Sequence, residues 1–258
     1  MIGGTGLEAV ALLDLRTESI ATPYGKVTVE IGRFEAHDEP IVFMSRHGKG
    51  HTVPPHLVNY RANIWALKEL GVRKIIATAA VGSLSSRLQL GDIVLLDQFL
   101  DFTKSRSQTF YEGGGQGVLH VDMTEPYCRS VQAVIREAGE SIGVPLQGGA
   151  AYVCTEGPRF ETPAEIRMYQ ILGGECVGMT SVPEVVLARE CGMCYATIAM
   201  VTNEAAGIAD HPLTHQEVVE SLQAAGNKAA GLIQETFRIL RHEQDCRCQM
   251  ANAEVGKF

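Results

Sequence analysis

The sequence has no excess of basic residues and no long apolar run. Its 258 residues include 22 lysines and arginines against 30 aspartates and glutamates, a formal net charge of −8 at pH 7. This balance disfavours general binding to a nucleic-acid backbone or an anionic membrane surface. No apolar stretch reaches the ~18 residues of a membrane span, and the N-terminus lacks the pattern of a signal peptide. We therefore expect a cytoplasmic protein with no nucleic acid and no membrane among its partners.

The seven cysteines lack the paired spacing that is typical of a zinc site. Cys191 and Cys194 form a C-x-x-C pair, but no second pair with zinc-like spacing accompanies them, so we expect structural thiols. Cys246 and Cys248 are separated by one residue in a polar tail, where a disulfide would close a strained and labile ring. The sequence thus predicts no metal site and no catalytic role for either pair.

Apolar strand-like runs alternate with helical patterns, and no linker, repeat or low-complexity segment divides the chain. The expected strands are 26–33, 40–45, 74–79, 92–98, 149–154 and 194–202, and the expected helices are 56–70, 127–142, 163–172, 183–192 and 215–241. Such alternation is typical of a single α/β domain with a mixed, mostly parallel twisted β-sheet flanked by α-helices. We assign residues 1–241 to this domain and residues 242–258 to a polar C-terminal tail.

Local patterns predict three helix starts and one flexible loop. Residues 162–165 (TPAE), 181–184 (SVPE) and 214–217 (THQE) each match the S/T-x-x-E capping box. Residues 104–120 (KSRSQTFYEGGGQGVLH) contain four glycines, and we expect them to form a mobile flap.

The first glycines, in GGTGLEAV (residues 3–10), allow two interpretations. Gly4, Gly6 and Ala9 fit the G-x-G-x-x-A spacing of a dinucleotide-binding turn, which would suit an NAD(P)-linked oxidoreductase. The same glycines would also fit around a single inorganic phosphate. A dinucleotide fingerprint needs a full preceding strand and an acidic residue about 20 positions later, and both are missing here. A start a few residues upstream would explain the short first strand under either interpretation.

Small and polar residues follow most of the apolar runs. They are residues 3–6 (GGTG), 46–48 (RHG), 79–83 (AAVGS), 155–157 (TEG), 179–180 (MT) and 202–203 (TN). In open α/β sheets, ligands bind beyond the carboxyl ends of the strands. Hydroxyls, backbone N–H groups and a guanidinium suit an anion. The sequence therefore predicts an anion site at this edge of the sheet.

Several long segments resemble the trimeric family of purine nucleoside phosphorylases and methylthioadenosine phosphorylases. They are IGGTGL (2–7), SRHGKGHTVPPHLVNYRANIWALKELG (45–71), GSLSSRLQLGDIVLLDQFLDFT (82–103), TEGPRFETPAEI (155–166), GMTSVPEVVLARE (178–190) and MVTN (200–203). The resemblance implies a pentosyltransferase of purine salvage that cleaves the N-glycosidic bond of a purine nucleoside with phosphate. The products would be the free base and a sugar 1-phosphate. It also implies no metal or organic cofactor, and a homotrimer or a dimer of trimers.

The resemblance also implies roles for individual residues. Phosphate would be held by Thr5, Arg46, His47, Ala79, Ala80 and Thr180. Met179 would lie against the ribose, and Phe160 would pack on the purine ring. Tyr152 would contact the ribose as well, although a strand tyrosine is equally typical of a core. His120, at the end of the flap, would reach the site of a neighbouring subunit.

Four positions indicate which nucleoside is cleaved. Glu161 stands where the methylthioadenosine branch tends to carry serine, and its carboxylate would accept N1–H of hypoxanthine or guanine, which adenine lacks. Asn203, with Ala205 in place of the aspartate of the adenosine-type branch, would donate to O6 and accept from a protonated N7. His215 would hydrogen-bond the 5′-hydroxyl. Asn203 and His47 are the predicted catalytic residues.

We therefore predict a purine nucleoside phosphorylase that acts on inosine and guanosine. The segments VNYRANIWALKE and VPEVVLARE instead resemble the methylthioadenosine branch. A phosphorylase of S-methyl-5′-thioinosine or S-methyl-5′-thioadenosine is thus the main alternative. A non-catalytic nucleoside-binding protein would require the loss of a phosphate ligand, and the sequence retains them all.

Overall fold

The computed structural model describes residues 1–4, 12–35, 39–209, 215–241 and 246–253. Within these residues the chain forms one sheet whose strands are β1 (Ile2–Gly3), β2 (Leu13–Thr22), β3 (Gly25–Arg33), β4 (Ile41–Ser45), β5 (Lys74–Ser83), β6 (Ile93–Phe102), β7 (Leu146–Thr155), β8 (Cys176–Gly178) and β9 (Cys194–Glu204). The helices are α1 (Tyr60–Glu69), α2 (Arg129–Ile142), α3 (Pro163–Ile171), α4 (Ser181–Glu190) and α5 (His215–Ile239). None of the described helices is long and apolar enough to cross a membrane.

Parallel pairs form the centre of the sheet. The strand order is β2-β3-β4-β1-β5-β8-β7-β6-β9, and β9 also pairs with β5. The pairs β1–β4, β1–β5, β5–β9, β6–β7 and β7–β8 are parallel, and β2–β3, β3–β4, β5–β8 and β6–β9 are antiparallel. The predicted single α/β domain with a mixed sheet flanked by helices is confirmed.

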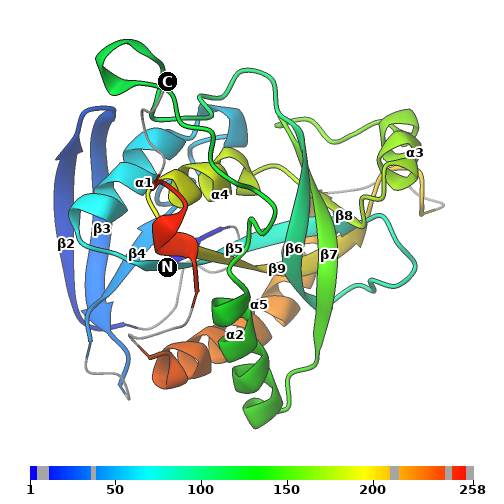
Figure 1. Cartoon of the computed structure of the whole chain (residues 1–258). Helices are drawn as coiled ribbons and strands as arrows, with labels where there is room; N and C mark the ends of the chain where they lie inside the picture. The colour runs from blue at the N-terminus through cyan, green and yellow to red at the C-terminus, as the bar shows by residue number, and fades with distance from the viewer. Residues whose placement is uncertain (5–11, 36–38, 210–214, 242–245, 254–258) are drawn as a thin grey trace.

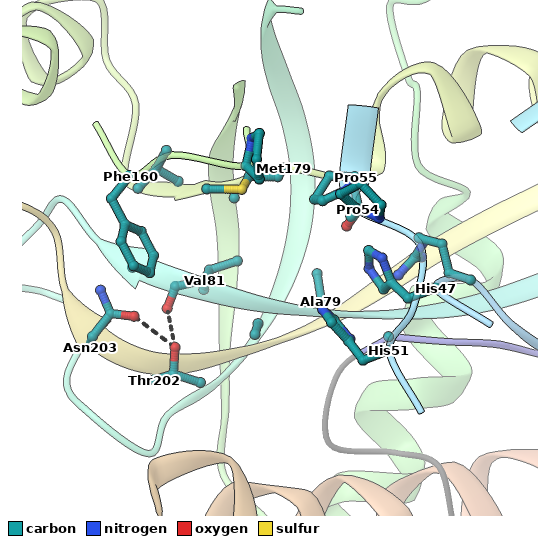
Figure 2. A pocket seen from close by; sticks show the side chains of 18 of the residues that line it. His47, His51, Pro54, Pro55, Ala79, Val81, Phe160, Met179, Thr202 and Asn203 are labelled. Carbon is teal, nitrogen blue, oxygen red and sulfur yellow. Dashed lines mark hydrogen bonds between the residues drawn. The ribbon is translucent and has the colours of Figure 1, made fainter. Parts of the chain in front are cut away.

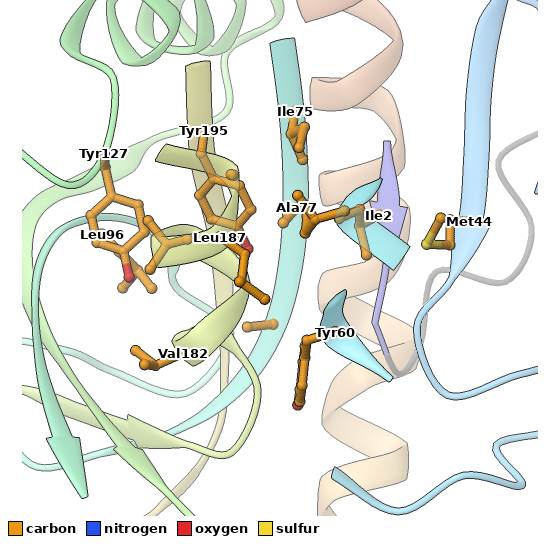
Figure 3. Close-up of a cluster of buried hydrophobic side chains, with 14 of the residues drawn as sticks. Ile2, Met44, Tyr60, Ile75, Ala77, Leu96, Tyr127, Val182, Leu187 and Tyr195 are labelled. Atoms are coloured by element: carbon orange, nitrogen blue, oxygen red, sulfur yellow. The ribbon is translucent and has the colours of Figure 1, made fainter. Parts of the chain in front are cut away.

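Helices cover both faces of the central strands. In Figure 1, α1 and α4 lie on one side of β5 and β9, and α2 and α5 lie on the other. Alternate residues of β5 serve the two cores: Ile75 and Ala77 pack with α1 and α4, whereas Ile76 packs with α2 and α5. Figure 3 shows the first core, where Leu187 of α4 faces Ala77 of β5. This two-sided burial explains why the strands are near-continuous apolar runs.

Two strands have no expected counterpart in the sequence. β2 is exposed along most of its length, so it lacks the buried face that produces an alternating pattern. β8 has only three residues, too few for a periodic signal. The first expected helix also begins late, because Pro54 and Pro55 lead into a short 3-10 turn and α1 starts only after Asn59, whose side chain accepts from Ala62 N.

The predicted capping boxes have different outcomes. At α3 the box is present, with Thr162 and Glu165 each bonded to the backbone of the other. At α4 the prediction is wrong: the N-cap residue is Thr180, which makes no side-chain cap bond. Glu184 turns inward to a buried arginine instead of capping the helix. Residue 214, the first of the third predicted box, lies outside the described residues.

The loop predicted as a mobile flap is anchored over its first half. The Arg106 guanidinium donates to the carbonyls of Val182, Thr155 and Glu156 at 2.7–3.1 Å. Glu190 of α4 accepts from the Phe110 backbone N–H at 2.8 Å. Arg106 of the loop thus binds backbone groups of the domain, and Glu190 of the domain binds a backbone group of the loop. The glycine count did not predict these contacts.

Candidate active site

A cavity of ≈ 480 Å³ opens beyond the carboxyl ends of the parallel strands. This volume is ordinary for a site that takes a small metabolite. Ten predicted site residues lie in its wall: Arg46, His47, Ala79, Ala80, Phe160, Glu161, Met179, Thr180, Asn203 and Ala205. Figure 2 shows Phe160 and Asn203 at one end, His47 and His51 at the other, and Met179 between the two ends. We call these the asparagine end and the arginine end.

The arginine end is organised around a buried ion pair. Arg46, which follows β4, donates through Nε and Nη2 to the two carboxylate oxygens of Glu184, each at 2.7 Å. Glu184 is 0% exposed and also accepts from Tyr195 Oη at 2.6 Å. Burial alone would lower the pKa of Arg46, but the charge of Glu184 outweighs it and the pKa is raised. The guanidinium is therefore charged and fixed in direction.

The ion pair leaves donors of Arg46 available to a ligand. A third N–H, on Nη1, donates to Thr78 O at 2.9 Å. Three of the five guanidinium N–H groups are thus engaged, and the other two have no partner among the residues that the structure describes. Gly4 lies against them, since a Cβ there would sit 2.9 Å from Nη1 and 2.7 Å from Thr78 O. A bare backbone at residue 4 is what keeps this end of the cavity open.

His47 lies beside Arg46 as a neutral imidazole. Burial, followed by the charge of Arg46, lowers the pKa of His47 to about 4. Its Nδ1 lies 2.8 Å from Val53 O. Because a carbonyl only accepts, Nδ1 carries the proton and Nε2 keeps a lone pair in the neutral ring. The ring can therefore gain a proton when an anion binds nearby.

Thr180 brings a hydroxyl into the cavity wall. Its backbone N–H donates to Tyr152 Oη at 3.0 Å, and its side chain makes no capping bond to α4. Tyr152 itself is 0% exposed and does not line the cavity, so its connection to the site runs through Thr180. Tyr152 is therefore a core residue, which was the alternative to a ribose contact.

Met179 occupies the middle of the cavity wall and requires a glycine opposite. Gly157 has a φ of +65°, and a Cβ on it would lie 2.6 Å from the Met179 sulfur. Only glycine adopts this conformation freely and leaves room for the thioether. The segment TEGPRF therefore brings its backbone directly against Met179.

At the asparagine end, a half-buried carboxylate is held by a threonine hydroxyl. Glu161 Oε1 accepts from Thr155 Oγ1 at 2.7 Å. Burial raises the pKa of Glu161, and the Thr155 hydrogen bond partly counters this shift. Phe160 next to it is 43% exposed, which is unusual for a large apolar ring. A flat apolar surface thus lies beside a carboxylate in the cavity wall.

Asn203 completes this end. Its Oδ1 accepts from Thr202 Oγ1 at 2.8 Å (Figure 2). Its Nδ2 donates to Glu204 O at 2.8 Å. Within the described part of the chain, one amide hydrogen and one oxygen lone pair remain without a partner. Gly82 leaves the space for this amide, since a Cβ there would sit 2.9 Å from Nδ2. Asn203 therefore presents one donor and one acceptor in a fixed orientation.

Three other predicted residues are not among those that line the described cavity. Thr5 lies outside the described residues. His215 is the first residue of α5, but its side chain is not described. His120 is exposed on the loop before α2 and does not line the cavity of its own chain.

Sequence reasoning missed how the site residues are held in place. Glu184 fixes Arg46 from behind and is itself held by Tyr195. Thr155 fixes Glu161 through its hydroxyl. Glu184 was interpreted as a capping residue because SVPE fits that pattern. A carboxylate inside the otherwise apolar run VPEVVLA was the available signal, since a buried charge requires a partner.

Comparisons with known proteins agree with this geometry. Residues 1–238 match the phosphorylase superfamily. A probable 6-oxopurine nucleoside phosphorylase of Moorella thermoacetica is 50% identical over 99% of this chain and 98% of its own length. A probable S-methyl-5′-thioinosine phosphorylase of Methanothermobacter thermautotrophicus is 53% identical over 97% of this chain and 87% of its own length.

A solved structure extends the agreement to the fold. The methylthioadenosine phosphorylase of Schistosoma mansoni in complex with adenine superposes with a TM-score of 0.90 at 35% identity, covering 98% of this chain and 94% of that chain. The match spans the strands, the helices and the segments that line the cavity. With a family match over nearly its whole length, the chain belongs to the phosphorylase superfamily.

Proposed function

We propose that the protein is a 6-oxopurine nucleoside phosphorylase, which cleaves inosine and guanosine with phosphate to the free base and ribose 1-phosphate. The observation that carries the proposal is the pairing of Glu161 with Asn203 at one end of a cavity whose other end holds Arg46. Four relatives at 49–50% identity that are named 6-oxopurine nucleoside phosphorylase, or probably so, support it.

At the arginine end, phosphate would meet donors that the fold has already oriented. Two Arg46 N–H groups and the Thr180 hydroxyl would bond its oxygens, and His47 would take up a proton as the dianion arrives. The ion pair with Glu184 keeps Arg46 from turning toward solvent. Phosphate would thus be held in one position, against the sugar carbon that it attacks.

At the asparagine end, protein side chains would recognise the base by hydrogen bonds and stabilise it as it leaves. The Glu161 carboxylate would accept N1–H of hypoxanthine or guanine, with Phe160 against the ring. The Asn203 amide would donate to O6 and accept from N7–H, relieving the negative charge of the leaving base. Met179, between the two ends, would contact the ribose (Figure 2). The proposed reaction needs no metal or organic cofactor.

We also propose the trimeric assembly of the resembling family, in which His120 of one subunit reaches a neighbouring site. The exposed position of His120 supports this role, since it does not line the cavity of its own chain.

S-methyl-5′-thioinosine is the second candidate substrate. It carries the same hypoxanthine, so Glu161 and Asn203 fit it equally well. A relative named as a probable phosphorylase of this nucleoside is 53% identical. The two substrates differ only at the 5′ position, which is the position predicted for His215. Replacing His215 with valine is expected to favour the methylthio nucleoside, and an unchanged preference would remove His215 from the 5′ pocket.

The direct test is phosphate-dependent release of hypoxanthine from inosine. The purified protein is expected to release the base in phosphate buffer and not in a buffer without phosphate or arsenate. Comparing kcat/KM for inosine, guanosine, methylthioinosine, adenosine and methylthioadenosine then ranks the substrates. A preference for either adenine nucleoside would overturn the base assignment, and release without phosphate would overturn the reaction.

A further inference from the structure

Four cysteines from three separate segments of the chain meet at the opposite end of the strands from the cavity. The four-cysteine cluster consists of Cys128, Cys194, Cys246 and Cys248, whose sulfur atoms all lie within 4.8 Å of one another. Cys194 begins β9, and nine residues of extended strand, roughly 30 Å, separate it from Asn203 at the cavity. The cluster therefore has no part in the proposed reaction.

The fold brings the two body cysteines together. Cys128 precedes α2, and its backbone N–H donates to Tyr195 O at 2.8 Å, beside Cys194. The backbone of Cys194 is in turn fixed by Arg73 O at 2.9 Å. These two thiols thus occupy positions set by the sheet.

The C-terminal segment contributes the other two. Cys246 Sγ lies 3.3 Å from Cys194 Sγ, and Cys248 is 4% exposed in a short 3-10 turn (Cys248–Met250). A Cβ on Gly192 would meet the Gln249 backbone at 3.4 Å, so the segment packs closely on the start of β9. The C-terminal segment therefore packs on the domain at Cys246, Cys248 and the backbone of Gln249.

The spacing of the sulfurs matches a tetrahedral thiolate site. Zinc binds thiolates at ~2.3 Å, which places ligand sulfurs about 3.8 Å apart, within the distances found here. A closed set of four buried or half-buried thiols is typical of structural rather than catalytic zinc sites. The C-x-x-C pair of the sequence does not form the site, since Cys191 packs in the core on the other side of the sheet.

Positive charge surrounds the cluster. Arg189 Nη1 donates to Cys248 Sγ at 3.3 Å, and Lys74 is the residue paired with Cys194 in the sheet. Such surroundings stabilise thiolates, the form that binds metal.

We propose that the four-cysteine cluster binds one soft divalent cation of the zinc class, which fastens the C-terminal segment to the domain. The cation would replace the thiol protons, forming four metal–sulfur bonds with no change of oxidation state. The net charge of −2 on the metal and four thiolates would be offset by Arg189 and Lys74. The site is independent of the proposed function.

The test is the zinc content of the full chain purified under reducing conditions without added chelator. We expect one zinc per chain by plasma mass spectrometry, and a Cobalt(II)-loaded sample with the visible bands of tetrahedral thiolate coordination. The double variant Cys246→Ser with Cys248→Ser is expected to contain at least roughly tenfold less zinc per chain than the wild type. Because these residues lie in the terminal segment, the variant should retain phosphorolysis at low temperature.

The matched control is Cys191→Ser, a cysteine outside the cluster, which should keep its zinc. Four free cluster thiols without metal would overturn the proposal. A mass four daltons below that of the reduced chain would also overturn it, because it would mean that the sulfurs pair as two disulfides. An equal zinc content in the double variant and the wild type would also overturn the proposal.

Discussion

The two ends of the cavity are built differently. At the arginine end, the charged group is buried and held by the protein: Arg46 is 4% exposed and bonded to Glu184 and Thr78. At the asparagine end, Glu161 has one side-chain partner and Phe160 is 43% exposed. The arginine end is fixed by the core of the domain. The asparagine end consists of a loop and a strand end, and its polar groups can still form hydrogen bonds with a ligand.

This difference indicates which part of the cavity can change without disturbing the fold. An anion site that depends on a buried ion pair cannot change without disturbing the fold, because removing one charge leaves the other unpaired. Side chains at the asparagine end can be exchanged at little cost to folding. Specificity for the base can therefore change while the phosphate site is kept.

The largest effect is expected from breaking the arginine end. Glu184→Gln keeps the shape of the side chain but leaves Arg46 as a buried, uncompensated charge. We expect a loss of about 3 kcal/mol in the free energy of unfolding, measured by denaturant titration, and a much higher half-saturating phosphate concentration.

Tyr195→Phe is the matched control, because it removes one hydrogen bond and retains the ion pair. It should cost only about 1 kcal/mol. Equal losses in the two variants would show that the ion pair does not dominate this end.

The next largest effect should come from exchanging the base-reading residues. Glu161→Ser together with Asn203→Asp is expected to shift the ratio of kcat/KM for adenosine over inosine by roughly 100-fold, with little change in stability. The two single variants separate the contributions. An unchanged ratio would mean that other residues read the base.

His47 offers a pH test of the arginine end. Its pKa of about 4 in the free protein means that the ring is neutral at pH 7. A bound dianion favours the imidazolium and raises this pKa, so binding takes up a proton. Inhibition by sulfate, which stays dianionic, should tighten roughly tenfold from pH 7 to pH 5. His47→Gln should abolish this dependence, and the same slope in that variant would assign the proton to another group.

The smallest effect is expected at Thr155. Thr155→Val removes the hydrogen bond to Glu161, so KM for inosine should rise about fivefold. Because that bond lowers the pKa of Glu161, its loss raises the pKa further. The fall of kcat/KM toward acid pH, as the carboxylate becomes protonated, should therefore begin at a higher pH in the variant. An unshifted pH profile would indicate that Glu161 does not need to be ionised.

The sequence predicted the central sheet and most of the cavity wall because both leave local patterns. Strands buried on two faces appear as apolar runs, and small or polar residues after them meet at one edge. β2 was missed because it has no buried face. Glu184 was misassigned because its partner Arg46 is 138 residues away, and no local pattern reports such a contact.

The cysteines show the same limit. The C-x-x-C spacing drew attention to Cys191, yet the fold separates it from Cys194 and brings Cys128 and the C-terminal pair together instead. Proximity through the sheet is not encoded in spacing along the chain. Tyr152 is a further case, since strand position alone did not tell a residue of the cavity wall from one directly behind it.

The burial of Arg46 has a consequence for how the protein responds to its ionic environment. The donors that would face phosphate lie inside the domain, where dissolved ions screen them little, whereas the net charge of −8 repels anions from a distance and is readily screened. Inert electrolyte therefore weakens the repulsion more than the attraction. Anion affinity in this protein should hold, or even improve, as ionic strength rises, unlike that of a site built from surface lysines.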